Sequence, residues 1–329
     1  MKIYSIAELQ KIINTDLHIR LEELKKMNPA DLYHPVDYSL EIGGKRLRPT
    51  LLLMGYNMFL DSVQDAVPAA IAVEVFHNFT LLHDDIMDKA EVRRNKPTVH
   101  KKFSENSAIL SGDVMAFLSY RYLSESKSGN ILEVFNLFTK TAIEVCEGQQ
   151  FDMEFETRMD VQEKEYLEMI RLKTAVLLAC SLKAGALLAN ADKEVAEQLY
   201  EFGINLGIAF QLQDDLLDSF GDQKSFGKKI GGDILANKKT FLSINALQNA
   251  TGSEKQELLN WMNATDCNPD DKILAVLRIY NQLKIKELTE QKIESYFQKC
   301  KIIFHEISVD ETRKQQLNEI SKSMLKRVY

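Results

Sequence analysis

The hydrophobic positions of this chain recur at the spacing of an α-helix over long stretches. In the segment Val195–Phe220, apolar side chains follow one another at intervals of three or four residues: Leu199, Phe202, Leu206 and Phe210. This spacing places them on one face of a helix. The segment from Leu167 to Ala189 repeats the pattern. No stretch shows the sustained alternation of apolar and polar residues that strands would need, so the pattern predicts helices and no sheet.

Proline and glycine mark the expected ends of these helices. Five of the six prolines lie in the first third of the chain, and none occurs between Pro97 and Pro269. Because proline breaks helices, its absence favours long helices in between. Glycine-rich or polar breaks fall at Ser126–Asn130, Gly221–Gly232, Ala250–Glu254 and Thr265–Asp271. The two ends, Ser5–Met27 and Thr312–Tyr329, are amphipathic. With no repeat or dividing linker, we expect one all-α domain over residues 1–329.

The composition is that of a globular protein, with 45% hydrophobic and 27% charged residues. A formal net charge of −7 argues against nucleic-acid binding in bulk. The N-terminal residues lack the apolar core of a signal peptide, and we expect no transmembrane segment because no apolar run approaches about 20 residues. The four cysteines are widely scattered and indicate reduced thiols. These features predict a cytoplasmic protein.

The pattern DDxxD occurs twice, each time at the C-terminal end of an apolar helical segment. The acidic residues are Asp84, Asp85 and Asp88 in the first copy and Asp214, Asp215 and Asp218 in the second. Like charges four residues apart repel on a helix, and helix C-termini disfavour anions. Mg²⁺ would remove this conflict, because it binds one or two carboxylates and completes its coordination with water and phosphate. A solvated acidic face is the alternative for one copy, but two copies favour a metal–diphosphate site. Neither copy has the spacing of a Ca²⁺ loop.

Basic residues cluster at short range around both acidic motifs. Lys45, Arg46 and Arg48 lie between two glycines and Pro49, and Arg93-Arg94 follow the first motif by five residues. After the second motif come the basic residues Lys228, Lys229, Lys238 and Lys239, and Lys173-Thr174 interrupt an otherwise apolar helix. Each cluster alone would read as a solvated surface. Together with the carboxylates they indicate a site for phosphate groups.

These motifs, in this order and spacing, resemble the trans-isoprenyl diphosphate synthase family. The match runs from Gly43 to about Lys239 and also includes Pro97-Thr98, Gly112-Asp113, Gln149 and Gly227-Lys228. The resemblance implies a bundle of antiparallel helices around a central cavity, usually in a homodimer. It further implies that the two aspartate motifs face each other across the cavity mouth and hold a small Mg²⁺ cluster.

The resemblance also implies roles for individual residues. Asp84, Asp88 and Asp214 would bind metal directly, while Asp85, Asp215 and Asp218 would bind it or support the ligands. Arg93, Lys173, Lys228 and Lys238 would hold the allylic diphosphate, whereas Lys45, Arg48, His77 and Arg94 would hold isopentenyl diphosphate. Thr174 and Gln211, with Lys173, would lie near the reacting carbon. His77 lies two turns before Asp84 on the same helical face, although a packed core histidine is the alternative.

The length of the product would be set by Phe79 and Thr80, which precede Asp84 by five and four residues. In similar enzymes an aromatic residue at the Phe79 position closes the hydrocarbon tunnel, so we expect a C15 or C20 product. Simple core packing is the alternative for Phe79. The expected reaction condenses dimethylallyl, geranyl or farnesyl diphosphate with isopentenyl diphosphate. Two other classes remain: a class I terpene cyclase, which would usually keep one DDxxD, and a non-catalytic partner subunit, which would tend to lose one.

Overall fold

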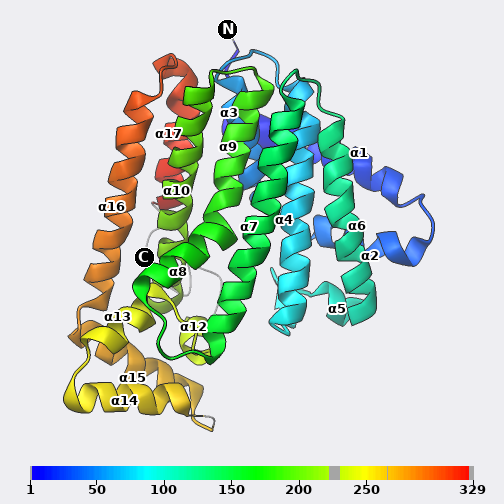
Figure 1. The fold of residues 1–329 in the computed structure, drawn as a ribbon. Coiled ribbons are helices and arrows are strands. Elements are labelled where there is room, and N and C mark those ends of the chain that lie inside the picture. Colours follow the sequence, from blue (N-terminus) through cyan, green and yellow to red (C-terminus); the bar gives the residue numbers. More distant parts are fainter. Residues whose placement is uncertain (1, 222–229, 265, 326–329) are drawn as a thin grey trace. The chain divides into compact units, whose positions relative to one another are not determined.

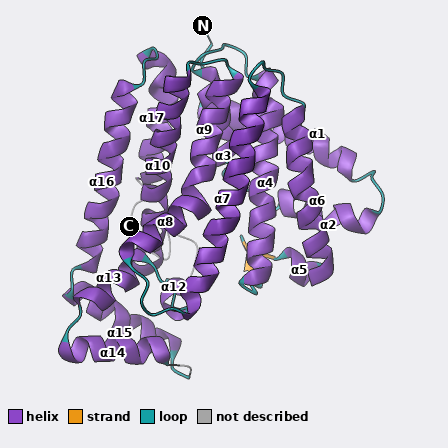
Figure 2. Ribbon diagram, in the orientation of Figure 1, coloured by secondary structure: helices purple, strands orange, loops and turns teal. Residues whose placement is uncertain are grey.

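The computed structural model of the protein describes residues 2–221, 230–264 and 266–325, and almost all of its regular structure is helical (Figure 2). The predicted all-α class is confirmed. Lys228 and its neighbour Lys229 lie outside the described residues. The chain folds into two compact units, each assembled from separate stretches of sequence. The first contains Met1–Lys140, Cys180–Tyr200 and Ile307–Asn318; the second contains Thr141–Ala179, Glu201–Glu306 and Glu319–Tyr329. The expectation of one domain stays a prediction.

The first unit is built mainly from the N-terminal helices. In chain order its elements begin with α1 (Ile6–Leu24), α2 (Ala30–Glu41), α3 (Leu47–Asn57), the short 3₁₀ helix η1 (Gln64–Ala66), α4 (Val67–Met87), α5 (Val99–Lys102) and α6 (Glu105–Ser124). The helix predicted over Ser5–Met27 is confirmed as α1. It begins at a capping box, in which the side chains of Ser5 and Glu8 each accept from the other residue's backbone N–H.

Helix α4 is the central element of the first unit because it is apolar on almost all sides. It packs against α3 and α6, and α4 and α6 run side by side in Figure 1. Among the described residues, one helical segment, Gln64–Met87, is both long enough and apolar enough to cross a membrane. However, 67% of its apolar window is buried inside the protein. That burial is typical of a core helix.

A small β-hairpin follows α4 and was not predicted. Strands β1 (Val92–Arg93) and β2 (Lys96–Pro97) pair antiparallel. The two residues between them, Arg94 and Asn95, have φ angles of 52° and 61°, as in a type I′ turn. The prediction of no strands was therefore wrong here. Each strand is only two residues long, which is too short for an alternating pattern to appear.

The second unit contains the later helices. Four helices contribute residues to both units: α7 (Ile131–Thr157), α9 (Val176–Leu188), α10 (Lys193–Phe220) and α17 (Glu311–Leu325). The second unit also holds α8 (Glu163–Ile170), the π-helical turn η2 (Arg171–Ala175), α12 (Gly232–Leu235), α13 (Phe241–Asn249), α14 (Gly252–Asn263), α15 (Pro269–Gln282) and α16 (Ile285–Glu306). The predicted helix Val195–Phe220 corresponds to α10. The predicted helix Thr312–Tyr329 corresponds to α17 as far as Leu325, and its last residues, 326–329, lie outside the described residues. Helix ends fall at or next to each of the four predicted breaks.

Candidate active site

The first aspartate motif forms the C-terminal end of α4, as predicted. Asp84 and Asp88 lie one helical turn apart, because the N–H of Asp88 donates to the carbonyl of Asp84 at 2.8 Å. Asp85 is buried, and its Oδ2 accepts from Arg93 Nε at 2.8 Å. Arg93 Nη2 also lies 3.7 Å from Asp84 Oδ2. Arg93 is thus held by two carboxylates of the motif, which raise its pKa against the opposing effect of burial.

The donors of this motif fit part of a Mg²⁺ site. Asp84 is half-buried and Asp88 is exposed, so solvent reaches both. Asp85 Oδ1 is buried and has no hydrogen-bond partner among the residues that the structure describes, which is uncommon for a carboxylate oxygen. In the described residues, no three His, Cys, Asp or Glu side chains come together as a complete metal cage.

Four cationic or imidazole side chains predicted to hold isopentenyl diphosphate all lie in the first unit. Arg48 Nη1 is 3.0 Å from His77 Nε2. Burial and then the nearby guanidinium of Arg48 lower the pKa of His77 well below its ordinary value. The imidazole is therefore neutral, and its Nε2 can accept a hydrogen bond from Arg48. His77 and Arg48 are brought together as the sequence predicted.

Arg94 joins this group through the glycine-rich segment. A Cβ atom at Gly44 would lie only 2.7 Å from Arg94 Nη1, so only glycine lets the guanidinium lie against the backbone there. Lys45 follows Gly44 directly, and its carbonyl accepts from Gln10 Nε2 at 2.9 Å. Arg94 itself occupies the left-handed region, as the first turn position of the β1–β2 hairpin requires.

Arg46 and Glu74 are partners that the sequence analysis did not identify. Arg46 points inward from the N-terminus of α3, and its Nη1 lies 2.5 Å from Glu74 Oε1. Glu74 also accepts from Asn78 Nδ2 at 3.0 Å. The cations of this basic segment therefore differ in role. Arg46 anchors the segment to α4, while Lys45 and Arg48 lie on either side of Arg46 in the sequence. Helical periodicity marks Glu74 only as an acidic residue within an apolar helix.

Phe79 and Thr80 lie on α4 in half-buried positions before the aspartates. The Phe79 ring packs at 5.5 Å from Phe76 and 4.8 Å from His83. Phe76 in turn contacts Phe138 of α7 at 5.3 Å. Thr80 Oγ1 donates to the carbonyl of His77 at 2.8 Å. Phe79 thus borders an aromatic cluster about one turn before the motif, and its role in product length stays a prediction.

The second unit contains an open cleft of mixed charge, with a cavity volume of about 110 Å³. It contains carboxylates, lysines and hydrogen-bonding neutral groups: Asp152, Asp215, Asp233, Lys173, Lys238, Lys239, Tyr166, Thr174, Gln211 and Thr240. Met169 and Ile170 complete its wall. Three lysines beside three aspartates make up the environment expected for a metal-bound diphosphate. The structure brings Lys173, Thr174, Gln211, Asp215 and Lys238 together in this cleft, and their roles in binding and catalysis stay predictions.

A chain of hydrogen bonds runs from the predicted catalytic residues to the second aspartate motif. Thr174 Oγ1 donates to Gln211 Oε1 at 3.0 Å, and Gln211 Nε2 donates to Asp215 Oδ1 at 2.9 Å. The buried hydroxyl of Tyr166 donates to the other oxygen of Asp215. Burial, followed by the charge of Asp233, raises the pKa of Asp215 well above its ordinary value. Asp215 is therefore held by neutral donors on both oxygens.

Lys173 is positioned by an unusually close approach of α7. Its Nζ lies 2.6 Å from Asp152 Oδ2. Four residues before Asp152, a Cβ at Gly148 would lie 2.4 Å from the backbone nitrogen of Lys173. Glycine thus lets α7 reach the π-helical turn η2, which contains both Lys173 and Thr174. Such turns are frequent at functional sites.

The last aspartate of the second motif is tied to the following loop. Asp218 Oδ2 accepts from the N–H of Asp233 at 2.9 Å, and the Asp218 carbonyl accepts from the N–H of Gly231 at 2.7 Å. Asp214 lies on α10 one turn before Asp218 and is half-buried. Asp218 thus holds the start of α12, the short helix that contains Asp233 and precedes Lys238.

Three residues of the cleft were missed by the sequence analysis: Asp152, Tyr166 and Asp233. Asp152 follows Gln149 by three residues, so the motif containing Gln149 could have pointed to it. Tyr166 precedes Lys173 by seven residues, which is two turns of a regular helix. Single acidic and aromatic residues of this kind are otherwise indistinguishable from surface or core positions.

Comparison with known proteins agrees with this arrangement. Residues 29–280 match the family model described as polyprenyl synthetase. The geranylgeranyl diphosphate synthase of Methanosarcina mazei is 43% identical over 245 residues, covering 73% of this chain and 76% of that protein. The short chain isoprenyl diphosphate synthase of Methanocaldococcus jannaschii is 44% identical over 243 residues, covering 72% and 73%.

Solved structures show the same fold along nearly the whole chain. A geranylgeranyl pyrophosphate synthase crystal structure is similar with a TM-score of 0.92 and 44% identity, covering 99% of this chain and 100% of that one. The geranylgeranyl pyrophosphate synthetase of Pyrococcus horikoshii has a TM-score of 0.90 and 30% identity, covering 98% and 97%. This chain belongs to the polyprenyl synthetase family. It has the all-α isoprenoid synthase fold and is a prenyltransferase of isoprenoid biosynthesis.

Proposed function

We propose that the protein condenses isopentenyl diphosphate with an allylic diphosphate to make a short-chain prenyl diphosphate, with geranylgeranyl diphosphate (C20) as its main product. The observation that carries the proposal is that each of the two units contains cationic side chains suited to bind a diphosphate group. Arg48, His77 and Arg94 would form one such site in the first unit, and the cleft around Lys173 and Lys238 would form the other in the second unit. The names of the relatives, geranylgeranyl diphosphate synthase above all, support C20.

The reaction breaks the allylic C–O bond and forms a new C–C bond to the alkene of isopentenyl diphosphate, after which a proton leaves. Mg²⁺, held by the aspartates, would neutralise charge on the leaving diphosphate. Lys173 and Lys238 would add fixed positive charge beside that group. Because these charges are already in place, they would stabilise the leaving diphosphate in the transition state with little reorganisation of the protein. The released diphosphate can accept the proton, so no nucleophile or side-chain base is required.

Thr174 and Gln211 would lie beside the carbon that becomes positive. The Gln211 amide oxygen already accepts from Thr174, so these neutral dipoles are fixed before the substrate binds. A fixed dipole can stabilise a developing cation without providing a nucleophile that would trap it. The cleft would also have to exclude water from the cation.

The two rival classes make different demands on the sequence. A terpene cyclase has no need for a site that holds isopentenyl diphosphate, whereas the Arg48–His77 contact and the approach of Arg94 to Gly44 support such a site in this proposal. A non-catalytic subunit has no need for two intact aspartate motifs. Both observations favour the condensing enzyme.

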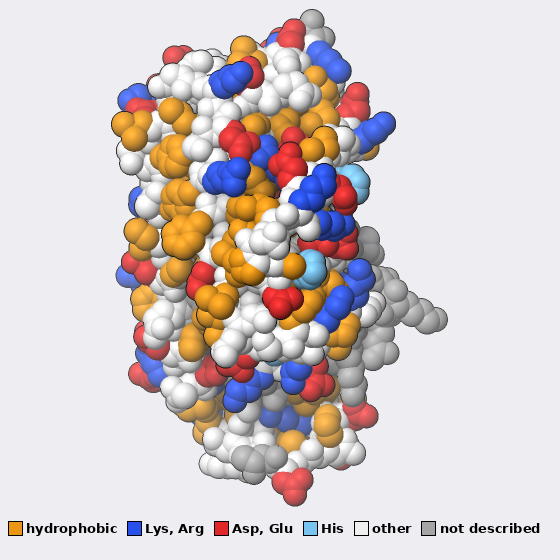
Figure 3. Space-filling model, turned by 90° about the vertical axis from the view of Figure 1, so that its right-hand side faces the viewer, with side chains coloured by type: hydrophobic (Ala, Val, Ile, Leu, Met, Phe, Trp, Pro, Cys, Tyr) orange, Lys and Arg blue, Asp and Glu red, His pale blue; other side chains and the backbone are white. Residues whose placement is uncertain are grey.

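A homodimer is part of the proposal, and the exposed apolar side chains of α6 support it. Leu110 and Phe117 are seven residues apart on this helix and are 57% and 75% exposed, so they share one face. Leu132 at the start of α7 is 70% exposed. Figure 3 shows hydrophobic side chains interspersed with charged ones on one face of the protein.

Light scattering tests the proposed homodimer. The wild type should give twice the monomer mass, and a Leu110→Lys/Phe117→Lys variant should give the monomer mass.

One assay separates the proposed function from its rivals. Purified protein is incubated with Mg²⁺, isopentenyl diphosphate and dimethylallyl, geranyl or farnesyl diphosphate in turn, and the products are sized. We expect C20 diphosphate from each primer and no activity in excess chelator. Hydrocarbon formed from an allylic diphosphate alone would indicate a cyclase. Inactivity of the pure protein, restored by another synthase subunit, would indicate a partner role.

A further inference from the structure

The turn between α12 and α13 determines where Lys238 points. The N–H of Lys238 donates to the carbonyl of Asp233 at 3.0 Å, and its carbonyl accepts from Ser243 Oγ at 2.9 Å. The preceding residue, Asn237, has a φ of 53°, in the left-handed region that asparagine tolerates better than most residues. The direction of the Lys238 side chain therefore depends on how Asn237 is held.

Lys272, on α15, holds the side chain of Asn237. Its Nζ donates to Asn237 Oδ1 at 2.7 Å, and the residue is only 3% exposed. In the part of the chain that the structure describes, this is the one hydrogen bond of its amino group, and no carboxylate forms an ion pair with it. Burying an ammonium group costs several kcal/mol unless good partners compensate it. A single neutral amide compensates poorly, and such exceptions are expected at functional sites.

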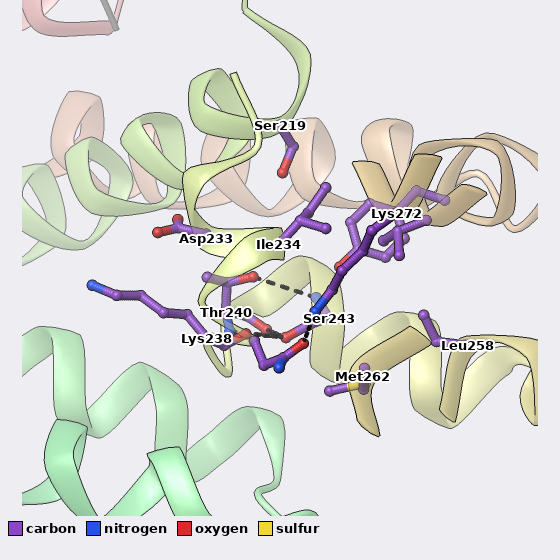
Figure 4. Close-up of a pocket in the computed structure, with 12 residues that line it drawn as sticks. Ser219, Asp233, Ile234, Lys238, Thr240, Ser243, Leu258, Met262 and Lys272 are labelled. Atoms are coloured by element: carbon purple, nitrogen blue, oxygen red, sulfur yellow. Dashed lines mark hydrogen bonds between the residues drawn. The ribbon is translucent and has the colours of Figure 1, made fainter. Parts of the chain in front are cut away.

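Figure 4 shows the place where Lys272 meets the loop. This small pocket, with a cavity volume of about 20 Å³, is lined by Ser219, Asp233, Lys238, Thr240 and Lys272 among others. Lys272 enters from α15, whereas the side chains of Asp233 and Lys238 extend away from it, to the same side of the loop. Asp233, Lys238 and Thr240 also line the cleft that contains Lys173. These shared residues thus separate the pocket from the cleft. Lys272 lies on the pocket side, and the Lys238 side chain extends toward the other side.

We propose that Lys272 is a positioning residue, which fixes the turn at Asn237 and so aims Lys238 at the allylic diphosphate. This inference rests on the proposed function of the cleft. Lys272 does not contact the substrate. It acts through Asn237, whose left-handed turn reverses the chain immediately before Lys238.

The test compares steady-state kinetics of Lys272→Met, Lys238→Ala and the double variant with the wild type. We expect Lys272→Met to raise the KM for the allylic diphosphate about tenfold and to lower kcat by a similar factor, because small displacements of a catalytic group cost this much or more. The KM for isopentenyl diphosphate should stay within about twofold. The double variant should be no worse than Lys238→Ala alone, since both act through one side chain.

Arg278→Met on the same helix is the matched control. Arg278 is exposed and pairs with Glu257 at the surface, so its loss should leave all kinetic constants unchanged. If Lys272→Met does not fold, Asn237→Gly replaces it, since glycine keeps the left-handed turn and removes the acceptor. That variant should show the same rise in allylic KM.

Two results would overturn the inference. One is a Lys272→Met or Asn237→Gly enzyme with wild-type kinetic constants per folded molecule, whatever its melting temperature. The other is a double variant whose loss equals the sum of the single losses in free energy. Both require an active wild type, so they differ from failure of the proposed function, in which the wild type itself forms no prenyl diphosphate.

Discussion

Arg46 Nη1 and Glu74 Oε1 lie 2.5 Å apart, in an ion pair whose side chains are only 7% and 5% exposed. This pair joins the basic segment before α3 to the middle of α4, the helix that ends in the first aspartate motif. It therefore links the residues around Lys45 and Arg48 to the helix that carries His77.

Removing one partner of this pair should be much worse than removing both. Arg46→Met leaves the Glu74 carboxylate buried without its cation and should lower the free energy of unfolding by about 3–5 kcal/mol. The double variant Arg46→Met/Glu74→Leu should recover most of this loss, because it buries no uncompensated charge. Urea denaturation measures both. Equal losses in the single and double variants would contradict this account.

His77 should make stability depend on pH. Its folded-state pKa is well below the ordinary value of 6.5, owing to burial and the nearby arginines. The unfolded chain therefore binds a proton that the folded protein rejects, so His77 favours folding above pH 6.5 and this contribution is lost as the pH falls. The wild type should lose about 1.4 kcal/mol more than His77→Gln for each pH unit below 6.5, until the folded-state pKa is reached. Parallel pH–stability curves for the two proteins would show that His77 is not responsible.

The hydrogen bond from Tyr166 should orient the Asp215 carboxylate for Mg²⁺ binding. Burial, followed by the charge of Asp215, raises the pKa of Tyr166 well above its ordinary value, so the hydroxyl remains a donor. Tyr166→Phe removes one donor from a buried carboxylate, at a cost of about 1.5–3 kcal/mol. We expect the Mg²⁺ concentration for half-maximal activity to rise about tenfold.

Tyr296→Phe on α16 serves as the control for this effect. The Tyr296 hydroxyl makes no hydrogen bond within the described residues, so its removal should leave the Mg²⁺ requirement unchanged. If the Tyr166→Phe enzyme required the same Mg²⁺ concentration as the wild type, the Tyr166–Asp215 hydrogen bond would have no role in metal binding.

Gly148 should be intolerant of even one added methyl group. A Cβ there meets the backbone nitrogen of Lys173 at 2.4 Å, and a backbone atom cannot move aside as a flexible side chain can. Gly148→Ala should destabilise the protein by about 1–3 kcal/mol and lower activity, because α7 must move and separate Asp152 from Lys173. Gly129→Ala is the control, since its Cβ would meet only Asn190 Oδ1, at 3.9 Å. Thermal unfolding and kcat measured on both variants decide the matter.

Phe79→Ala should lengthen the product. Removing the ring opens space beside Phe76 and His83, and we expect the distribution to shift upward by one or more C5 units. Chromatography of the dephosphorylated products measures this. Phe135→Ala, which removes a half-buried ring that stacks on Tyr120, should leave the length unchanged. An unaltered distribution in Phe79→Ala would assign Phe79 to core packing alone.

The sequence by itself determined the helical class, the main helix breaks and the identity of most charged groups in the site. This was possible because helical periodicity and i,i+4 carboxylates are local properties, as in Asp84 and Asp88. The local pattern could not reveal the β1–β2 hairpin, since its two-residue strands are too short to show a period.

Only the tertiary structure decided which charged residues are buried against other protein groups and hold the site in place. Arg46 and Arg48 are two residues apart in one basic segment, yet one is buried against Glu74 and the other contacts His77. Lys272 looks like a surface lysine in the sequence but is buried against Asn237. Burial and pairing depend on which distant elements pack around a side chain, and a local pattern carries no information about those neighbours.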